Sequence, residues 1–189
     1  MGDSMSSMVL SGDTSGTVTV TVPAVAGTNT ATIPAATGTV MVSGNMPAFS
    51  AYCSTNQSIS TGVYTKIQIN TKTGSNNIAY DTNGYFDAVT NYRFTPLIAG
   101  YYQINGGVYN GNNGSTFNHG ISIYKNGSAN NYIFGSYPTG GALNITNVIY
   151  LNGSTDYVEL YYAQSSGTSQ LVTGGYQYTW FSGTLIRTA

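Results

Sequence analysis

Charged side chains are scarce in this sequence. Only 6% of its 189 residues are Asp, Glu, Lys or Arg, against about 25% in an average globular domain. Five scattered basic residues cannot form the basic patch that phosphate recognition needs, so the sequence predicts no nucleic-acid partner. No run of about 18 apolar residues occurs either, so we expect no membrane insertion.

Cysteine, histidine and glutamate are almost missing as well. A single cysteine, Cys53, excludes a disulfide framework within the chain, and one cysteine with one histidine cannot supply a zinc site. The first residues contain no basic segment followed by an apolar one. We therefore expect no secretory signal peptide and synthesis in the cytoplasm.

The residues that are abundant favour β-structure. Gly and Asn form turns, whereas Thr, Tyr and Val favour strands, and strong helix formers are few. The 17 Tyr, 6 Phe and 1 Trp argue against a disordered chain, because disordered chains are poor in aromatic residues. The composition therefore predicts an all-β protein.

The composition changes abruptly near Pro47. All five Met residues precede it, and the first aromatic residue, Phe49, follows it, so we divide the chain into residues 1–46 and 47–189. Residues 17–22 alternate Thr and Val, which is typical of a half-buried strand, and 30–33 and 39–42 are further extended pieces. This segment is too small to form its own core, so we expect it to pair with sister chains or with another protein. The candidate attachment residues are Val18, Val20, Val22, Ile33 and Val40.

Beyond Pro47, strand-like runs alternate with short turns at the spacing of a sandwich or barrel. Asn-Gly pairs at 83–84, 105–106, 110–111, 113–114, 126–127 and 152–153 predict tight turns. The expected strands are 48–53, 63–70, 92–95, 100–109, 120–125, 131–137, 143–151, 155–163 and 176–187.

Several motifs in the second part occur in the order of a known family. They are Ala48-Phe49-Ser50-Ala51-Tyr52, Tyr80-Asp81-Thr82-Asn83-Gly84-Tyr85-Phe86, Phe94-Thr95-Pro96 with Ala99-Gly100-Tyr101-Tyr102, Lys125-Asn126-Gly127, Leu151-Asn152-Gly153-Ser154-Thr155-Asp156-Tyr157-Val158, and Phe181-Ser182-Gly183-Thr184-Leu185-Ile186. Residues 47–189 thereby resemble the globular C1q domain of the C1q/TNF superfamily. Ser154-Thr155 departs from the pattern, because it lengthens the turn after Gly153.

The resemblance implies a ten-strand jelly-roll sandwich that assembles as a homotrimer. The abundance of aromatic residues agrees with an interface, because one small sandwich core is unlikely to enclose them all. Consecutive strand residues face opposite ways, so each Tyr-Tyr pair should place one ring in the core and one outside. The candidates for the trimer interface are Tyr101, Tyr102, Tyr109, Tyr161 and Tyr162; the alternative is that both faces are intramolecular core.

The first part resembles another class of protein. Residues 10–40, with Pro-Ala-Val-Ala-Gly-Thr-Asn-Thr and Ile-Pro-Ala-Ala-Thr-Gly-Thr, are similar to segments of phage tail-fibre and other virion-surface proteins. Together the two resemblances imply a protein of the phage particle surface, made in the infected bacterial cell. Its N-terminal segment would attach to another virion protein, such as the capsid, the portal or neck, or the tail. Its head would act as a fibre or adhesin, or alternatively as a head fibre or capsid decoration protein.

The loops of the head are the expected recognition elements, because loops carry binding residues on rigid scaffolds. Uncharged loops rich in Asn, Ser, Gly and Tyr suit a host-surface glycan, and solvated turns without a ligand are the equal alternative. The ligand-loop candidates are Asn113, Phe117, His119 and Tyr137.

Catalysis and cofactors are not expected. The sequence offers only Cys53 with His119 for nucleophilic chemistry, and Cys53 fits better as a small buried residue. Asp156 and Glu159 lie three residues apart on one strand and should face opposite sides, which disfavours a glycosidase. The oxygen ligands around the turn at residues 81–87 fit either a bound calcium ion or a side-chain-stabilised turn without a metal.

Overall fold

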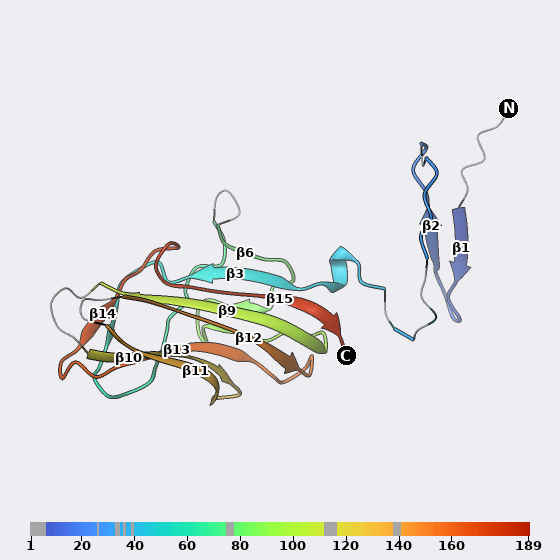
Figure 1. Ribbon diagram of the computed structural model, residues 1–189. Coiled ribbons are helices and arrows are strands. Elements are labelled where there is room, and N and C mark those ends of the chain that lie inside the picture. The colour runs from blue at the N-terminus through green and yellow to red at the C-terminus, as the bar shows by residue number, and fades with distance from the viewer. Residues whose placement is uncertain are drawn as a thin grey trace. The chain divides into compact units, whose positions relative to one another are not determined.

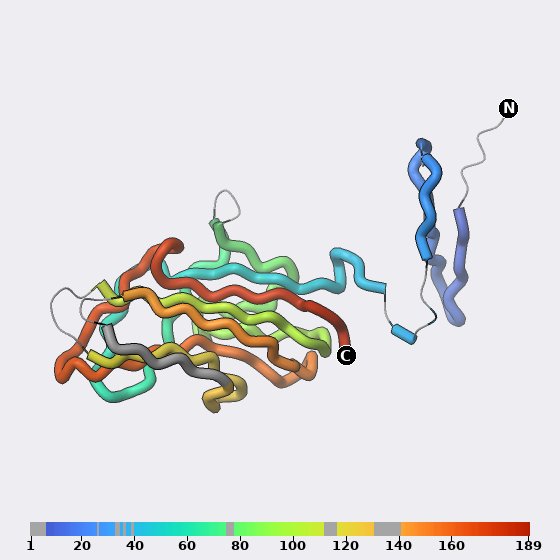
Figure 2. Tube along the Cα trace, viewed as in Figure 1, coloured from blue at the N-terminus to red at the C-terminus, as the bar shows by residue number. Residues whose placement is uncertain are grey.

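The computed structural model describes residues 7–25, 27–32, 35, 37–38, 40–74, 78–111, 117–137 and 141–189, with the backbone alone for 131–137. The chain forms two compact units, Met1–Gly38 and Thr39–Ala189, which we describe separately. Figures 1 and 2 show that strands make up nearly all of the regular structure. Among the described residues no helix is long and apolar enough to cross a membrane.

The N-terminal unit contains a two-stranded antiparallel hairpin. Strand β1 (Ser7–Ser11) pairs with β2 (Thr17–Thr21), and β2 occupies the strand expected at 17–22. The other two extended pieces, 30–33 and 39–42, form no strand in the residues that are described there. The alternating Thr-Val segment has β1 as its partner, whereas the described residues of these two pieces pair with no strand.

The second unit, the head, begins earlier than the change in composition suggested. The boundary from the sequence follows Met46, whereas the compact unit starts at Thr39. Met41 packs against the core of the head, and the 3-10 turn η1 (Ser43–Asn45) follows it. Small aliphatic residues before the first aromatic residue therefore belong to the head, which composition alone did not reveal.

The head consists of two antiparallel sheets. One has the order β11-β10-β13-β8-β7, with β5 also paired to β13; the other has the order β4-β14-β9-β15-β3-β6, with β12 also paired to β9. The strands are β3 (Ala48–Tyr52), β4 (Gln57–Ile59), β5 (Thr65–Lys66), β6 (Tyr80–Asp81), β7 (Phe86–Asp87), β8 (Arg93–Phe94), β9 (Gly100–Asn110), β10 (Phe117–Lys125), β11 (Ser128–Tyr137), β12 (Gly141–Leu151), β13 (Val158–Gln164), β14 (Gln170–Val172) and β15 (Trp180–Thr188). The all-β expectation is thus confirmed.

The core lies between the two sheets and is built from their inward residues. Phe49 stacks on Phe94 and Phe86, with ring centroids 4.4 and 4.9 Å apart, and meets the edge of Phe181 at 5.4 Å. Cys53 is buried, as the sequence predicted, and burial raises the pKa of its thiol. Burying each large apolar side chain contributes roughly 1.5–3 kcal/mol, so this cluster is a main source of stability.

Asn-Gly pairs mark turns at some positions and not at others. Asn126 and Gly127 both have positive φ, 53° and 78°, and close the hairpin between β10 and β11 as expected. Asn105-Gly106 is an error of the turn prediction, because it lies inside β9. Gly106 is required there for space: a Cβ would lie 2.6 Å from the Leu160 side chain of the facing sheet. The pair at 110–111 ends β9, and 113–114 falls outside the described residues.

Candidate functional site

The paired tyrosines alternate between core and surface, as the strand geometry predicts. Tyr102 and Tyr162 are fully buried within one chain, so neither can contact a second subunit. Their prediction as trimer-interface residues is therefore wrong. Tyr101 is 40% exposed, and Tyr109 and Tyr161 are partly exposed. The interface candidates therefore reduce to Tyr101 and Tyr109 on one sheet and Tyr161 on the other.

Tyr101 and Tyr109 belong to a broad surface with almost no charge. We call it the neutral face and define it as the outward side chains of β3, β9, β12 and β15. On these four fully described strands every outward side chain is uncharged except Arg187. The members are Ala48, Ser50, Tyr52, Tyr101, Gln103, Asn105, Tyr109, Ala142, Asn144, Thr146, Val148, Tyr150, Trp180, Ser182, Thr184, Ile186 and Arg187.

Aromatic residues gather at both ends of the neutral face. At one end Tyr101 and Tyr150 lie with ring centroids 5.5 Å apart, and the Arg187 guanidinium lies 5.2 Å from the Tyr101 ring. At the other end Tyr109 lies 5.4 Å from Tyr178. The negative face of the Tyr101 ring attracts the guanidinium, which offsets part of the cost of removing this cation from water.

Amides and hydroxyls occupy the middle of the neutral face, around a shallow hollow. The hollow has a volume of about 560 Å³ and is lined by Asn105, Asn144, Ile145, Thr146, Trp180 and Ser182. Thr146 donates a hydrogen bond of 2.6 Å to the Asn105 side chain across β9 and β12. Side chains that bond to one another along the sheet can be covered by a partner without leaving each of them unsatisfied.

Tyr161 lies on the other sheet in a different environment. Its ring stacks on Tyr124 at 3.8 Å between centroids, beside the ion pair of Lys66 and Glu159 at 2.6 Å. Burial first, then the negative charge of Glu159, raises the pKa of Tyr161 to about 12. Tyr161 is thus engaged within its own chain and shares no surface with Tyr101.

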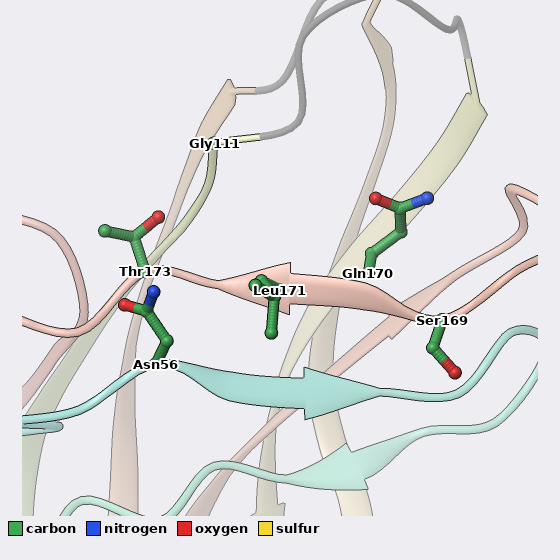
Figure 3. A pocket seen from close by; sticks show the side chains of 6 residues that line it. All are labelled: Asn56, Gly111, Ser169, Gln170, Leu171 and Thr173. Atoms are coloured by element: carbon green, nitrogen blue, oxygen red, sulfur yellow. The ribbon is translucent and has the colours of Figure 1, made fainter.

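A second concave site lies at the loop end of the sandwich, where the edge strand β4 and its neighbour β14 meet the end of β9 (Figure 3). It has a volume of about 410 Å³ and is lined by Asn56, Gly111, Ser169, Gln170, Leu171 and Thr173. We call it the loop-end pocket. Asn56 accepts a hydrogen bond of 2.9 Å from the Gly174 backbone, and Gln170 donates one of 2.9 Å to Ser166. Leu171 is exposed, so the pocket combines anchored amides with an apolar contact.

The ligand-loop candidates do not come together at this pocket. Asn113 lies outside the described residues, and Tyr137 ends β11, where the backbone alone is described. The prediction of Phe117 and His119 as ligand-binding loop residues is wrong. Both lie on β10 and are buried, so neither is available to a surface ligand. The Gly/Asn-rich sequence around them predicted a loop, with the strand beginning at residue 120. In the structure β10 already begins at Phe117, whose side chain is buried.

His119 instead belongs to a buried polar network that links three strands. Its Nδ1 lies 2.7 Å from the Tyr162 hydroxyl, which accepts a 3.2 Å hydrogen bond from the Asn110 amide. The histidine tautomer decides whether Nδ1 donates to this hydroxyl or accepts its proton. Burial lowers the pKa of His119 and raises that of Tyr162 to about 12, so both stay uncharged near neutral pH.

Three acidic side chains of the head form ion pairs with lysines. Glu159, Asp81 and Asp156 pair with Lys66, Lys72 and Lys125, at 2.6, 3.0 and 2.9 Å.

The turn at residues 81–87, the candidate calcium site, contains Asp81 of the pair with Lys72. The Asp81 carboxylate accepts hydrogen bonds from the backbone amides of Tyr85 and Phe86 as well as from Lys72. Backbone hydrogen bonds also lower the pKa of Asp87 to about 2. The arrangement is that of a side-chain-stabilised turn, and within the described ranges no three His, Cys, Asp or Glu residues gather as a metal site.

The candidate attachment residues lie on the surface where they are described. Val18 and Val20 are exposed on β2, and Val22 and Val40 are exposed outside strands. Ile33 is not among the described residues. The surface they form on the hairpin is considered below.

The fold and the two sheets define the class of the head: it is a jelly roll of the C1q/TNF type. Structures that share it include murine APRIL at pH 5.0 (TM-score 0.54, 11% identity, covering 75% of this chain and 99% of that one) and Eiger TNF from S. frugiperda (0.53, 7%, 76% and 93%). The globular domain of zebrafish complement 1qA also matches (0.50, 15%, 76% and 98%). No protein-family model matches the chain, and no curated protein matches it in sequence. At these identities the likeness concerns the fold alone.

Proposed function

We propose that this protein is a homotrimeric, non-enzymatic surface protein of a phage particle. Residues 1–46 attach it to another virion protein, and the jelly-roll head points outward and binds the host surface as a fibre or adhesin. The virion setting rests on the resemblance of residues 10–40 to phage surface proteins. The trimer rests on the neutral face, which is the observation that carries the proposal.

The neutral face suits contact between identical subunits. Symmetry repeats every charge, so a face with one stacked cation brings few like charges together and few ions out of water. Aromatic residues at both ends supply apolar contact area, as in the cores of protein interfaces. Because few charges take part, salt should weaken the assembly little, and we expect the trimer to persist in about 1 M NaCl.

The test is the mass of the intact protein in solution, measured by sedimentation. A trimer of the 19.9 kDa chain has a mass of about 60 kDa. Val148→Glu places a charge on the neutral face and should give monomers, whereas Val89→Glu, in an exposed turn outside it, should leave the trimer intact. A monomeric wild type, or a trimeric Val148→Glu protein, would refute this arrangement.

For the head we propose recognition of a host-surface glycan at the loop-end pocket. Its amides and hydroxyls suit sugar hydroxyls, and exposed Leu171 suits the apolar side of a sugar ring. Leu171→Arg should abolish binding of the intact protein to susceptible cells, whereas Leu97→Arg, another exposed leucine, should not. Absence of wild-type binding to any susceptible host would remove the adhesin role.

A capsid decoration or head-fibre role is the second candidate. Residues 22–38 alone separate the hairpin from the head, which is short for a fibre shaft. Imaging of whole particles with the protein labelled decides between the two roles. Copies over the entire capsid would favour decoration, and copies confined to the tail would favour a fibre.

A further inference from the structure

The hairpin of β1 and β2 has one apolar and one polar face. The register pairs Met8 with Val20 and Leu10 with Val18, and directly paired residues share a face of the sheet. Ser7, Ser11, Thr17, Thr19 and Thr21 lie on the opposite face with Val9. All four residues of the apolar face are at least half exposed, and Val18 reaches 65%.

The apolar face of the hairpin is expected to be buried against another protein surface. A two-stranded hairpin without a packed face is at best marginally stable in water, and every residue of β1 and β2 is exposed. The four side chains form a patch on the order of a few hundred Å². That is well below the roughly 800 Å² per partner of a typical specific interface, so one hairpin is a weak binding site for another protein.

We infer that the apolar faces of three hairpins cover one another, forming a second self-association site apart from the head. The inference rests on the proposed trimer of heads. Such a trimer would hold three hairpins at an effective concentration on the order of millimolar, where a small patch is sufficient. Residues 22–38 span up to about 60 Å when extended, so the three hairpins can reach a common axis.

The composition of the hairpin favours sister chains over a partner of opposite charge. Between Ser7 and Thr21 the only charged residue is Asp13, in the turn that connects β1 and β2. Identical copies can therefore pack without bringing several like charges together, and no charge pattern selects a foreign surface. The Ser/Thr face then remains outward and available to the virion partner.

Two cysteine variants of the full chain test this packing. Each variant adds one cysteine to a chain that keeps its native, buried Cys53, which does not compete. Val18→Cys lies on the apolar face, and Thr19→Cys, at the next residue of β2, lies on the polar face. Under mild oxidation at about micromolar protein we expect up to two-thirds of Val18→Cys chains to become covalent dimers. Fewer than a tenth of Thr19→Cys chains should do so, because disulfides need Cα atoms about 4.4–6.8 Å apart.

Each outcome decides the inference. Trimers that cross-link at position 18 and not at 19 support it. Trimers that cross-link at neither position, or equally at both, overturn it and leave the proposed head trimer standing. Monomers by sedimentation would overturn both. As a second readout, Val18→Thr/Val20→Thr should abolish amide-exchange protection of the hairpin while the head remains trimeric; unchanged protection would contradict the inference.

Discussion

The buried hydroxyl of Tyr162 provides a sharp test of the head structure. In Tyr162→Phe the ring still fills its site, but the hydrogen bonds to His119 and Asn110, at 2.7 and 3.2 Å, are lost. Removing a buried partner costs about 1–3 kcal/mol, because polar groups that have left water lose their compensation. Taking about 2 kcal/mol, the melting temperature should fall by about 4–8 °C for a unit of this size.

Two other tyrosines make the experiment a graded series. Tyr102→Phe removes one buried hydrogen bond, 2.7 Å to the Ile98 carbonyl, and should cost about 1 kcal/mol. Tyr176→Phe alters an exposed side chain outside the neutral face and should stay within about 0.5 kcal/mol of wild type. Urea unfolding at a fixed protein concentration measures all three. A Tyr162→Phe protein as stable as Tyr176→Phe would refute the buried network.

The remaining predictions concern acid stability and two glycines. Burial lowers the pKa of His119 below 6.5, so the unfolded chain gains a proton first as pH falls. Stability should be nearly constant between about pH 7 and 8 and decrease below pH 6.5. As this is the only histidine, His119→Gln should flatten the urea-midpoint profile between about pH 7 and 5.5, and an unchanged slope would exclude His119 as the cause. Gly153 and Gly84 have similar φ, +70° and +73°, but a Cβ at Gly153 would lie 2.7 Å from the backbone of Ile98, whereas at Gly84 it meets open space. Gly84→Ala should cost about 1–2 kcal/mol and Gly153→Ala several kcal/mol more in urea unfolding; equal costs would contradict the packing at Gly153.

Local sequence patterns were sufficient to predict the fold class and the positions of most of the long strands. Long alternating runs such as those in β9 and β12 were predicted nearly to their ends, because a half-buried strand imposes a period of two on its sequence. The short strands β4, β6, β7 and β14 were missed. Two or three residues carry no period, and these strands exist because a neighbouring strand supplies their hydrogen bonds.

The candidate sites were less predictable, because they depend on which surfaces face each other. The alternation at Tyr101-Tyr102 gave one ring inside and one outside, but not which ring. His119 lies in a stretch that is typical of a loop, but it is buried beside Tyr162, which is 43 residues away in sequence and whose hydroxyl also binds Asn110. The neutral face joins strands from opposite ends of the chain, so no local motif could have identified it.

The sequence by itself determined that the protein is all-β, poor in charge and divided into an aromatic-free segment and a Tyr-rich head. Those properties follow from composition and from a two-residue period, which are local. Only the tertiary structure decided that the charge-poor residues form one continuous face, that Asn105-Gly106 is strand rather than turn, and that His119 is core. These depend on long-range strand pairing and on the packing of one sheet against the other, which no single stretch of sequence contains.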